Sequence, residues 1–169
     1  VVVSTQHDEG LTTEQVRESA LAAIDGLTEE QLTHRVAPDA NPIAWLVWHA
    51  YRVQDDHVAD VAGLQQVWAA RGFIEFFDLD LDEDDTGYGH TSAQVGKVVA
   101  SAELLARYIE AVHDQTVTWI AGLDEDDLDR VVDTSWDPPV TLGARLVSVV
   151  NDDTQHVGQA AYLRGLLTA

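Results

Sequence analysis

The sequence contains no cysteine. The chain can therefore form no disulfide, offer no thiolate to a metal ion and attack no substrate with a cysteine nucleophile. This absence excludes the enzyme classes that carry their own reactive sulfur. Any sulfur chemistry at this protein requires a sulfur atom that a second molecule brings to it.

Basic residues are also scarce: nine lysines and arginines stand against 30 aspartates and glutamates, a formal net charge of −21. Such a charge repels phosphate backbones and anionic lipid headgroups, so we expect neither nucleic acid nor a membrane as partner. No apolar run approaches the ~20 residues of a bilayer span, and the first residues lack a basic segment followed by an apolar one. We expect a cytoplasmic protein. The acidity fits a halophile's protein as well as an ordinary acidic surface, and composition leaves both open.

What the sequence does contain is a series of long amphipathic segments. Apolar residues recur at helical spacing over residues 12–25, 42–63, 91–122 and 141–166. The expected starts carry helix signals, such as Thr12 with Gln15 three residues later and Asn41 followed by Pro42. With 169 residues, 46% of them hydrophobic, we expect a single domain over 1–169 that folds as an all-α four-helix bundle.

A long acidic connection, residues 64–90, joins the second and third segments and contains the run DLDLDEDDTG. It is longer than a hairpin between antiparallel helices needs, so we expect a crossover that makes these two helices parallel. The alternating acids resemble a calcium-binding loop, but its glycine and terminal glutamate do not fall at the required offsets. We therefore expect a solvated acidic loop.

Three polar residues interrupt the apolar faces of the second and fourth segments: His49, Asp152 and His156. Asp152 and His156 are four residues apart, so their side chains share one helical face. Two imidazoles and one carboxylate form a ligand set of hydrolytic zinc sites and non-haem iron sites, and a divalent ion offsets the cost of burying Asp152. The alternative is a buried Asp–His pair with His49 hydrogen-bonded elsewhere, and spacing alone leaves it open.

Two neighbours compete with this set. Asp153 is three residues before His156 and lies further round the helix than Asp152. His57 is eight residues after His49, which places it ~80° away at 100° per residue. We therefore expect Asp152 and His49 to face the site. The remaining histidines, including His90 in the acidic connection, have no partner at a diagnostic spacing.

The stretches NPIAWLVWHAYRVQDDHVAD and RLVSVVNDDTQHVGQAAYLRG resemble the DinB-like (damage-inducible-like) superfamily of four-helix-bundle metalloproteins. The resemblance spans nearly the whole chain and is strongest to the mycothiol-dependent branch. Its most specific parts are Trp48–His49 and the pattern Asp-x-x-x-His-x-Gly-Gln that begins at Asp152. Many members have His-x-x-x-His in the last helix, and Asp152 is similar to the glutamate of the mycothiol-dependent maleylpyruvate isomerases. The resemblance implies a metal ion held by His49, Asp152 and His156.

The resemblance also implies a reaction. A low-molecular-weight thiol binds near the divalent ion, loses its proton and attacks an electrophile. We therefore expect a thiol transferase or isomerase with a mycothiol-like cosubstrate and zinc or nickel as the ion. Its partners are small molecules, and a homodimer stays open. The alternatives are a metal-dependent hydrolase on the same scaffold and a non-catalytic metal-binding stress protein.

Three further residues are candidates for the surroundings of the site. Gln159, three residues after His156, is expected to orient that imidazole. Arg52 and Arg164 are the nearest basic side chains and are expected to hold a cosubstrate carboxylate. For both arginines, a salt bridge on a very acidic surface is the competing interpretation. No catalytic residue is assigned.

Overall fold

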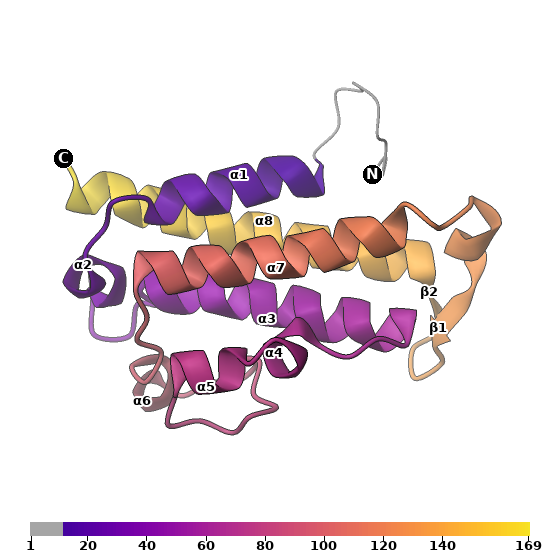
Figure 1. The fold of residues 1–169 in the computed structure, drawn as a ribbon, viewed down its shortest axis with the longest axis horizontal. Coiled ribbons are helices and arrows are strands. Elements are labelled where there is room, and N and C mark those ends of the chain that lie inside the picture. Colours follow the sequence, from indigo (N-terminus) through magenta and orange to yellow (C-terminus); the bar gives the residue numbers. More distant parts are fainter. Residues whose placement is uncertain (1–11) are drawn as a thin grey trace.

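The computed structural model describes residues 12–169 and shows a bundle of four long helices (Figure 1). These are α1 (Thr13–Ile24), α3 (Ile43–Ala62), α7 (Ala102–Ile120) and α8 (Leu142–Leu167). The shorter elements are α2 (Glu29–Thr33), α4 (Val67–Ala70), α5 (Phe73–Phe77), α6 (Ser92–Val95), the 3-10 turn Asp126–Asp129 and the antiparallel strands β1 (Val131–Asp133) and β2 (Val140–Thr141). The expected four-helix bundle is confirmed. Residues 1–11 of the expected domain lie outside the described residues.

The long helices begin close to where their sequence signals predict. Thr12 and Gln15 form a reciprocal capping box at the start of α1. The Thr141 hydroxyl accepts a hydrogen bond of 3.2 Å from the backbone N–H of Ala144 and so caps α8. In α3 the N-cap is Pro42, which is extended with ψ of 164°, and the helix begins one residue later than expected. Local capping chemistry therefore predicts the start of each of these helices to within one residue.

The third expected helix, residues 91–122, is divided in two, which corrects the prediction. Thr91 caps the short α6, the helix stops at Gly96, and the hydroxyl of Ser101 caps the separate helix α7. Glycine weakens a helix, and a serine hydroxyl competes for the helical backbone hydrogen bonds. The apolar spacing runs through this break because Val98 is buried in the core without being helical.

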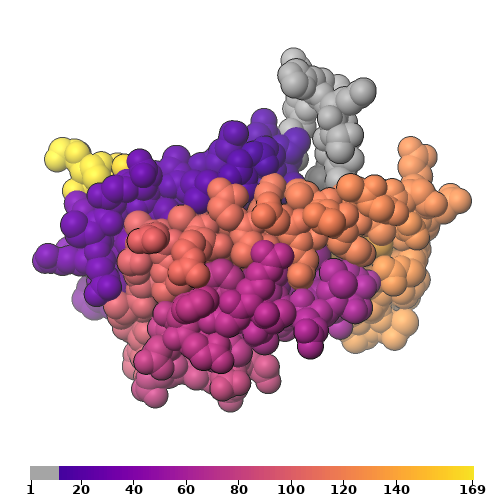
Figure 2. Space-filling view, viewed as in Figure 1, coloured from indigo at the N-terminus to yellow at the C-terminus, as the bar shows by residue number. Residues whose placement is uncertain are grey.

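The connection between α3 and α7 crosses over, and these two helices run parallel as expected (Figure 1). Most acidic residues of its acidic run are exposed, as expected, whereas the residues before that run form α4 and α5 and bury aromatic side chains. Trp68 of α4 and both Phe73 and Phe77 of α5 are at most 6% exposed. Figure 2 shows this crossover segment, in magenta, packed as a continuous surface with α7. Aromatic side chains before the acidic run supply the apolar area that this half of the connection buries.

A buried carboxylate fixes the crossover to α3. Asp55 is 1% exposed and accepts hydrogen bonds of 2.8 Å from the backbone N–H groups of both Val67 and Trp68. These are N–H groups of the first turn of α4, which have no partner within the helix. The Tyr108 hydroxyl of α7 donates a third bond, at 3.0 Å. Asp55 thus joins the crossover and α7 to the middle of α3, within two turns of His49.

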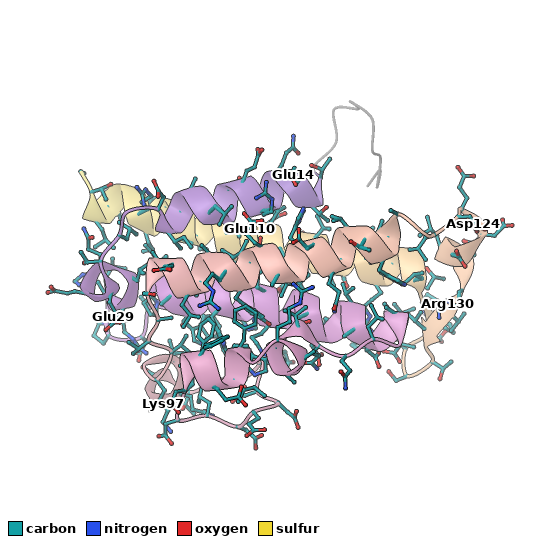
Figure 3. The ribbon with its side chains drawn as sticks, viewed as in Figure 1. Glu14, Glu29, Lys97, Glu110, Asp124 and Arg130 are labelled. Carbon is teal, nitrogen blue, oxygen red and sulfur yellow. The ribbon has the colours of Figure 1, made fainter. Side chains whose placement is uncertain are left out.

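Ion pairs connect the outer helices. Arg17 of α1 donates from Nη1 to Glu110 Oε1 of α7 at 2.7 Å and also pairs with Glu14 of its own helix. Figure 3 labels Glu14 on α1 and Glu110 on the neighbouring helix α7. Exposed pairs of this kind contribute at most about 1 kcal/mol. The bundle therefore depends mainly on its apolar core, and these pairs contribute little to the contact between α1 and α7. Across residues 12–169, no helix combines the length and apolarity needed to cross a membrane.

Candidate metal centre

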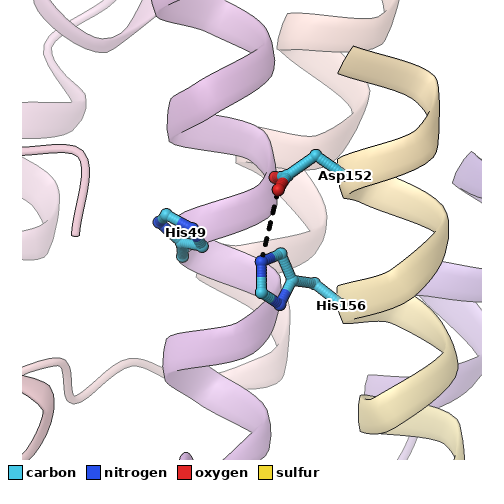
Figure 4. A group of neighbouring side chains, drawn as sticks. All are labelled: His49, Asp152 and His156. Atoms are coloured by element: carbon cyan, nitrogen blue, oxygen red, sulfur yellow. Dashed lines mark ion pairs between the residues drawn. The ribbon is translucent and has the colours of Figure 1, made fainter. Parts of the chain in front are cut away.

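Three side chains converge between α3 and α8 (Figure 4). His49 comes from α3, while Asp152 and His156 come from successive turns of α8. One ligand atom of each residue lies within 4.8 Å of the ligand atoms of the other two. The ring centroids of His49 and His156 are 4.8 Å apart, with the rings at 77°. The fold brings together the three residues that the sequence indicated, and the four-residue spacing on α8 puts two of them on one face.

The imidazole of His49 is held in one tautomer. His49 is 7% exposed, and its Nδ1 lies 2.5 Å from the backbone carbonyl oxygen of Thr86. A carbonyl oxygen can only accept, so Nδ1 carries the proton and donates it. This leaves the lone pair of Nε2 free to bind a cation. The indole of Trp45 stacks on the same ring, with centroids 4.6 Å apart and planes at 14°.

Asp152 and His156 carry polar atoms that the fold does not satisfy. His156 Nε2 lies 3.5 Å from Asp152 Oδ1, which is longer than an ordinary N–H···O bond. Asp152 Oδ2 and His156 Nδ1 are buried without a hydrogen-bond partner among residues 12–169. Buried polar groups nearly always have partners. A buried Asp–His pair that satisfies its own hydrogen bonds therefore does not explain these unpaired atoms. A divalent cation does, because two imidazoles and a carboxylate are suitable metal ligands.

The local electrostatics favour the protonation states that metal binding needs. Burial lowers the pKa of His49; the bond to Thr86 opposes this shift, and the nearby His156 adds to it. Burial alone would raise the pKa of Asp152, but the contact with His156 and its charge hold that pKa below the usual value. The neutral imidazole of His49 and the ionised carboxylate of Asp152 can therefore bind a metal ion without first releasing a proton of their own.

The two competing side chains lie elsewhere. Asp153 is 3% exposed and lines a small cavity inside the bundle together with Gln54 and Thr116. Burial raises the pKa of Asp153 well above its usual range, and the charge of Asp152 adds to this. His57 has its Nδ1 4.0 Å from Asp56, and neither His57 nor Asp153 belongs to the converging group. Adjacent aspartates therefore occupy different environments, one at the site and one in the core.

The three residues expected around the site have other contacts. Gln159 is exposed on α8. Arg164 donates to the carbonyl oxygen of Asp25 at 2.6 Å, at the C-terminal end of α1. Arg52 is fully buried, and its Nε donates to the carbonyl oxygen of Asp85 at 3.2 Å. Arg52 has no exposed surface, so it offers no solvent-facing group to a cosubstrate in this structure. Roles of these residues in binding a cosubstrate stay predictions.

The sequence reasoning missed the part of the acidic connection that reaches His49. His90, which seemed an ordinary loop histidine, has a side chain only 2% exposed, and its Nδ1 accepts a hydrogen bond of 3.1 Å from Trp45 Nε1. Thr86 supplies the carbonyl that binds His49. The signal available in the sequence was the run Gly87-Tyr-Gly-His, since paired glycines allow a backbone to approach closely.

Comparisons with known proteins show which family and which solved structure the chain is similar to. Residues 11–169 match the family model described as mycothiol-S-transferase. The chain is also similar to a crystal structure described as the conserved protein of locus from Enterococcus faecalis, with a TM-score of 0.86 and 30% identity. That match covers 92% of this chain and 92% of the other. None of the curated proteins compared with the chain matches it.

Proposed function

Because the chain belongs to the mycothiol-S-transferase family, we propose that it is a divalent-metal-dependent thiol S-transferase or isomerase that uses mycothiol or a similar small thiol. The observation that carries the proposal is the convergence of His49, Asp152 and His156, with ligand atoms within 4.8 Å of one another. Three protein ligands leave at least one coordination position for a further ligand. We propose zinc or nickel as the ion, since both suit imidazole ligands.

The chemistry follows from what the ligands and the cosubstrate contribute. A bound divalent ion lowers the pKa of a thiol beside it, so that the thiolate is present at neutral pH. Asp152 supplies one negative charge and the two neutral imidazoles supply none. A divalent ion held by these three ligands would keep a net positive charge, which favours an anionic fourth ligand such as a thiolate. The thiol proton leaves to solvent, the sulfur forms a bond to the electrophilic carbon, and the leaving group departs with its bonding pair. In an isomerase the thiol leaves again after the rearrangement.

We expect the metal-loaded protein to consume a thiol together with a halo-aromatic or bimane electrophile faster than the chelator-treated protein does. The reason is that only the loaded site raises the fraction of thiolate. Thiol loss and product formation, followed together, measure the rate. As the matched control, zinc or nickel is added back to the chelator-treated sample, and the rate of thiol consumption should be restored.

The other candidate functions predict different outcomes of the same assay. A hydrolase would turn over an ester or amide with no thiol present, because water takes the open position. A non-catalytic metal-binding protein would bind the ion and leave thiol conjugation at the uncatalysed rate. Either outcome would contradict the transferase proposal.

A further inference from the structure

Residues 85–90, the part of the crossover just before α6, lie against the candidate metal site and supply no ligand atom to it. We propose that this segment, the His49 loop, positions His49 for metal binding and is in turn ordered by the bound ion. The inference rests on the metal site of the proposed function. It goes beyond that site by assigning a role to residues that supply no ligand atom.

The first contact fixes which nitrogen of His49 is available. The Thr86 carbonyl oxygen lies 2.5 Å from His49 Nδ1, and it holds the proton on that nitrogen. Nε2 is then the only ring atom with a lone pair. If the loop moves away, the proton can shift to the other nitrogen and the ring can turn. The loop thus selects the tautomer that binds a metal ion.

The second contact requires a residue without a side chain. Gly87 has φ of +92°, and a Cβ atom there would lie 2.8 Å from His49 Nδ1. It would also lie 3.1 Å from the Trp48 ring and 3.2 Å from the Trp45 ring. Real Cβ contacts at 2.8 Å essentially do not occur, so a larger residue must displace the loop or the imidazole. Glycine is needed here both for its backbone conformation and for space.

A chain of polar contacts then ties the loop to the face of the His49 ring. Asp85 Oδ1 accepts the N–H of Gly87 at 2.9 Å, and Asp85 Oδ2 lies 2.8 Å from His90 Nε2, although the angle is poor for a hydrogen bond. On the other side of its ring, His90 Nδ1 accepts from Trp45 Nε1 at 3.1 Å. Trp45 in turn stacks on His49 at 4.6 Å. The loop therefore holds the imidazole at its edge directly and at its face through Trp45.

Arg52 anchors this arrangement to the core. Its Nε donates to the Asp85 carbonyl oxygen at 3.2 Å, and its Nη1 donates to Gln66 Oε1 at 2.9 Å. The loop is thus attached to a fully buried guanidinium one turn after His49 on α3. Groups that orient a ligating histidine typically change metal affinity by about 10- to 100-fold when they are lost. Because binding and loop order are linked, the coupling must act in both directions.

The chain offers a matched pair of glycines for the test. Gly87 and Gly89 both have positive φ, +92° and +72°, but a Cβ at Gly89 meets no atom within 4 Å. Replacing either with alanine strains the same loop, and only Gly87→Ala presses on His49. We expect Gly87→Ala to weaken zinc binding at least about 10-fold more than Gly89→Ala. Competition with a chromophoric zinc chelator measures both affinities.

A second variant covers the case in which Gly87→Ala fails to fold, which circular dichroism would show. His90→Phe keeps a ring beside Trp48 but removes the acceptor for Trp45 and the partner of Asp85. We expect it to weaken zinc binding by about 10-fold and to shift the visible spectrum of the cobalt form, since the His49 ring reorients. A change of stability alone would leave that spectrum unaltered.

Hydrogen exchange provides the reciprocal measurement. In the wild type, added zinc should slow the exchange of the backbone amides of the His49 loop more than that of the β1–β2 hairpin. If zinc binds wild type, Gly87→Ala, Gly89→Ala and His90→Phe with equal affinity, the positioning role is wrong while the metal site stands. If the wild type itself takes up no divalent ion, the proposed function fails and this inference fails with it.

Discussion

The His156→Ala variant should bind zinc at least about 100-fold more weakly than the wild type, because it loses one of three protein ligands. His156 is the residue that shares a helical face with Asp152 and also meets the His49 ring, at 4.8 Å between centroids. Its loss leaves two ligands on different helices, without the one-turn pair that converges on a single point. Equilibrium competition with a zinc chelator gives the two affinities.

The matched control is His57→Ala, which removes a histidine of α3 from outside the converging group. We expect its zinc affinity to lie within about 3-fold of the wild type. Larger changes, of about 10- to 100-fold, are typical of groups that orient a metal ligand, and His57 is not part of the converging group. Both variants should be shown to fold by their helical circular dichroism before zinc is added. Equal losses in the two variants would mean that the wrong imidazole has been assigned to the site.

The Asp153→Asn variant should be more stable than the wild type at neutral pH, by more than about 1 kcal/mol in metal-free buffer. Asp153 is 3% exposed, and its Oδ1 has no hydrogen-bond partner among residues 12–169. Burial, together with the charge of Asp152, raises the pKa of Asp153 well above its usual range. At neutral pH, folding must keep the Asp153 carboxyl group protonated, although it ionises in the unfolded chain, and this lowers the free energy of unfolding. The asparagine amide has the same shape and does not ionise, so that cost is absent.

The sign of the pH dependence follows from the raised pKa of Asp153. The contribution of Asp153 to the free energy of unfolding is fully present below the pKa that this residue has in the unfolded chain, about 3.9. It is lost as pH rises through the pKa that Asp153 has in the folded protein. Between these two pKa values the advantage of Asp153→Asn should grow by about 1.4 kcal/mol per pH unit. Urea unfolding from pH 5 to 8 measures it. The exposed Asp114→Asn change serves as the control, and a difference that stays flat with pH would contradict the prediction.

The sequence predicted the bundle because its signals are local. Capping by Thr12 and Thr141 and the apolar spacing of each helix involve residues within one or two turns of each other. The pairing of Asp152 with His156 is equally local, since a four-residue spacing fixes both on one face of α8. His49 was predicted from a different signal, a histidine within the apolar face of another helix, and the family resemblance then supported placing it with the other two.

What the sequence did not predict depends on contacts between distant residues. The carbonyl of Thr86 reaches His49 across 37 positions, and Trp45 reaches His90 across 45. No spacing rule covers such pairs, because they exist only after the crossover has folded against α3. The same reason applies to Val98. This residue is apolar because it packs in the core, and its position continues the helical spacing past the end of α6 although the chain there is not helical.

The most direct test of thiol activation at the His49, Asp152 and His156 site is a titration of the cobalt-substituted protein with mycothiol, or with a smaller thiol at higher concentration. Three protein ligands leave a position that a thiolate can occupy. We predict a sulfur-to-cobalt charge-transfer band that saturates with the thiol and is weakened in Asp152→Ala through poorer metal retention. Full loading with cobalt and a spectrum that no thiol changes would contradict the proposal that this site activates a thiol.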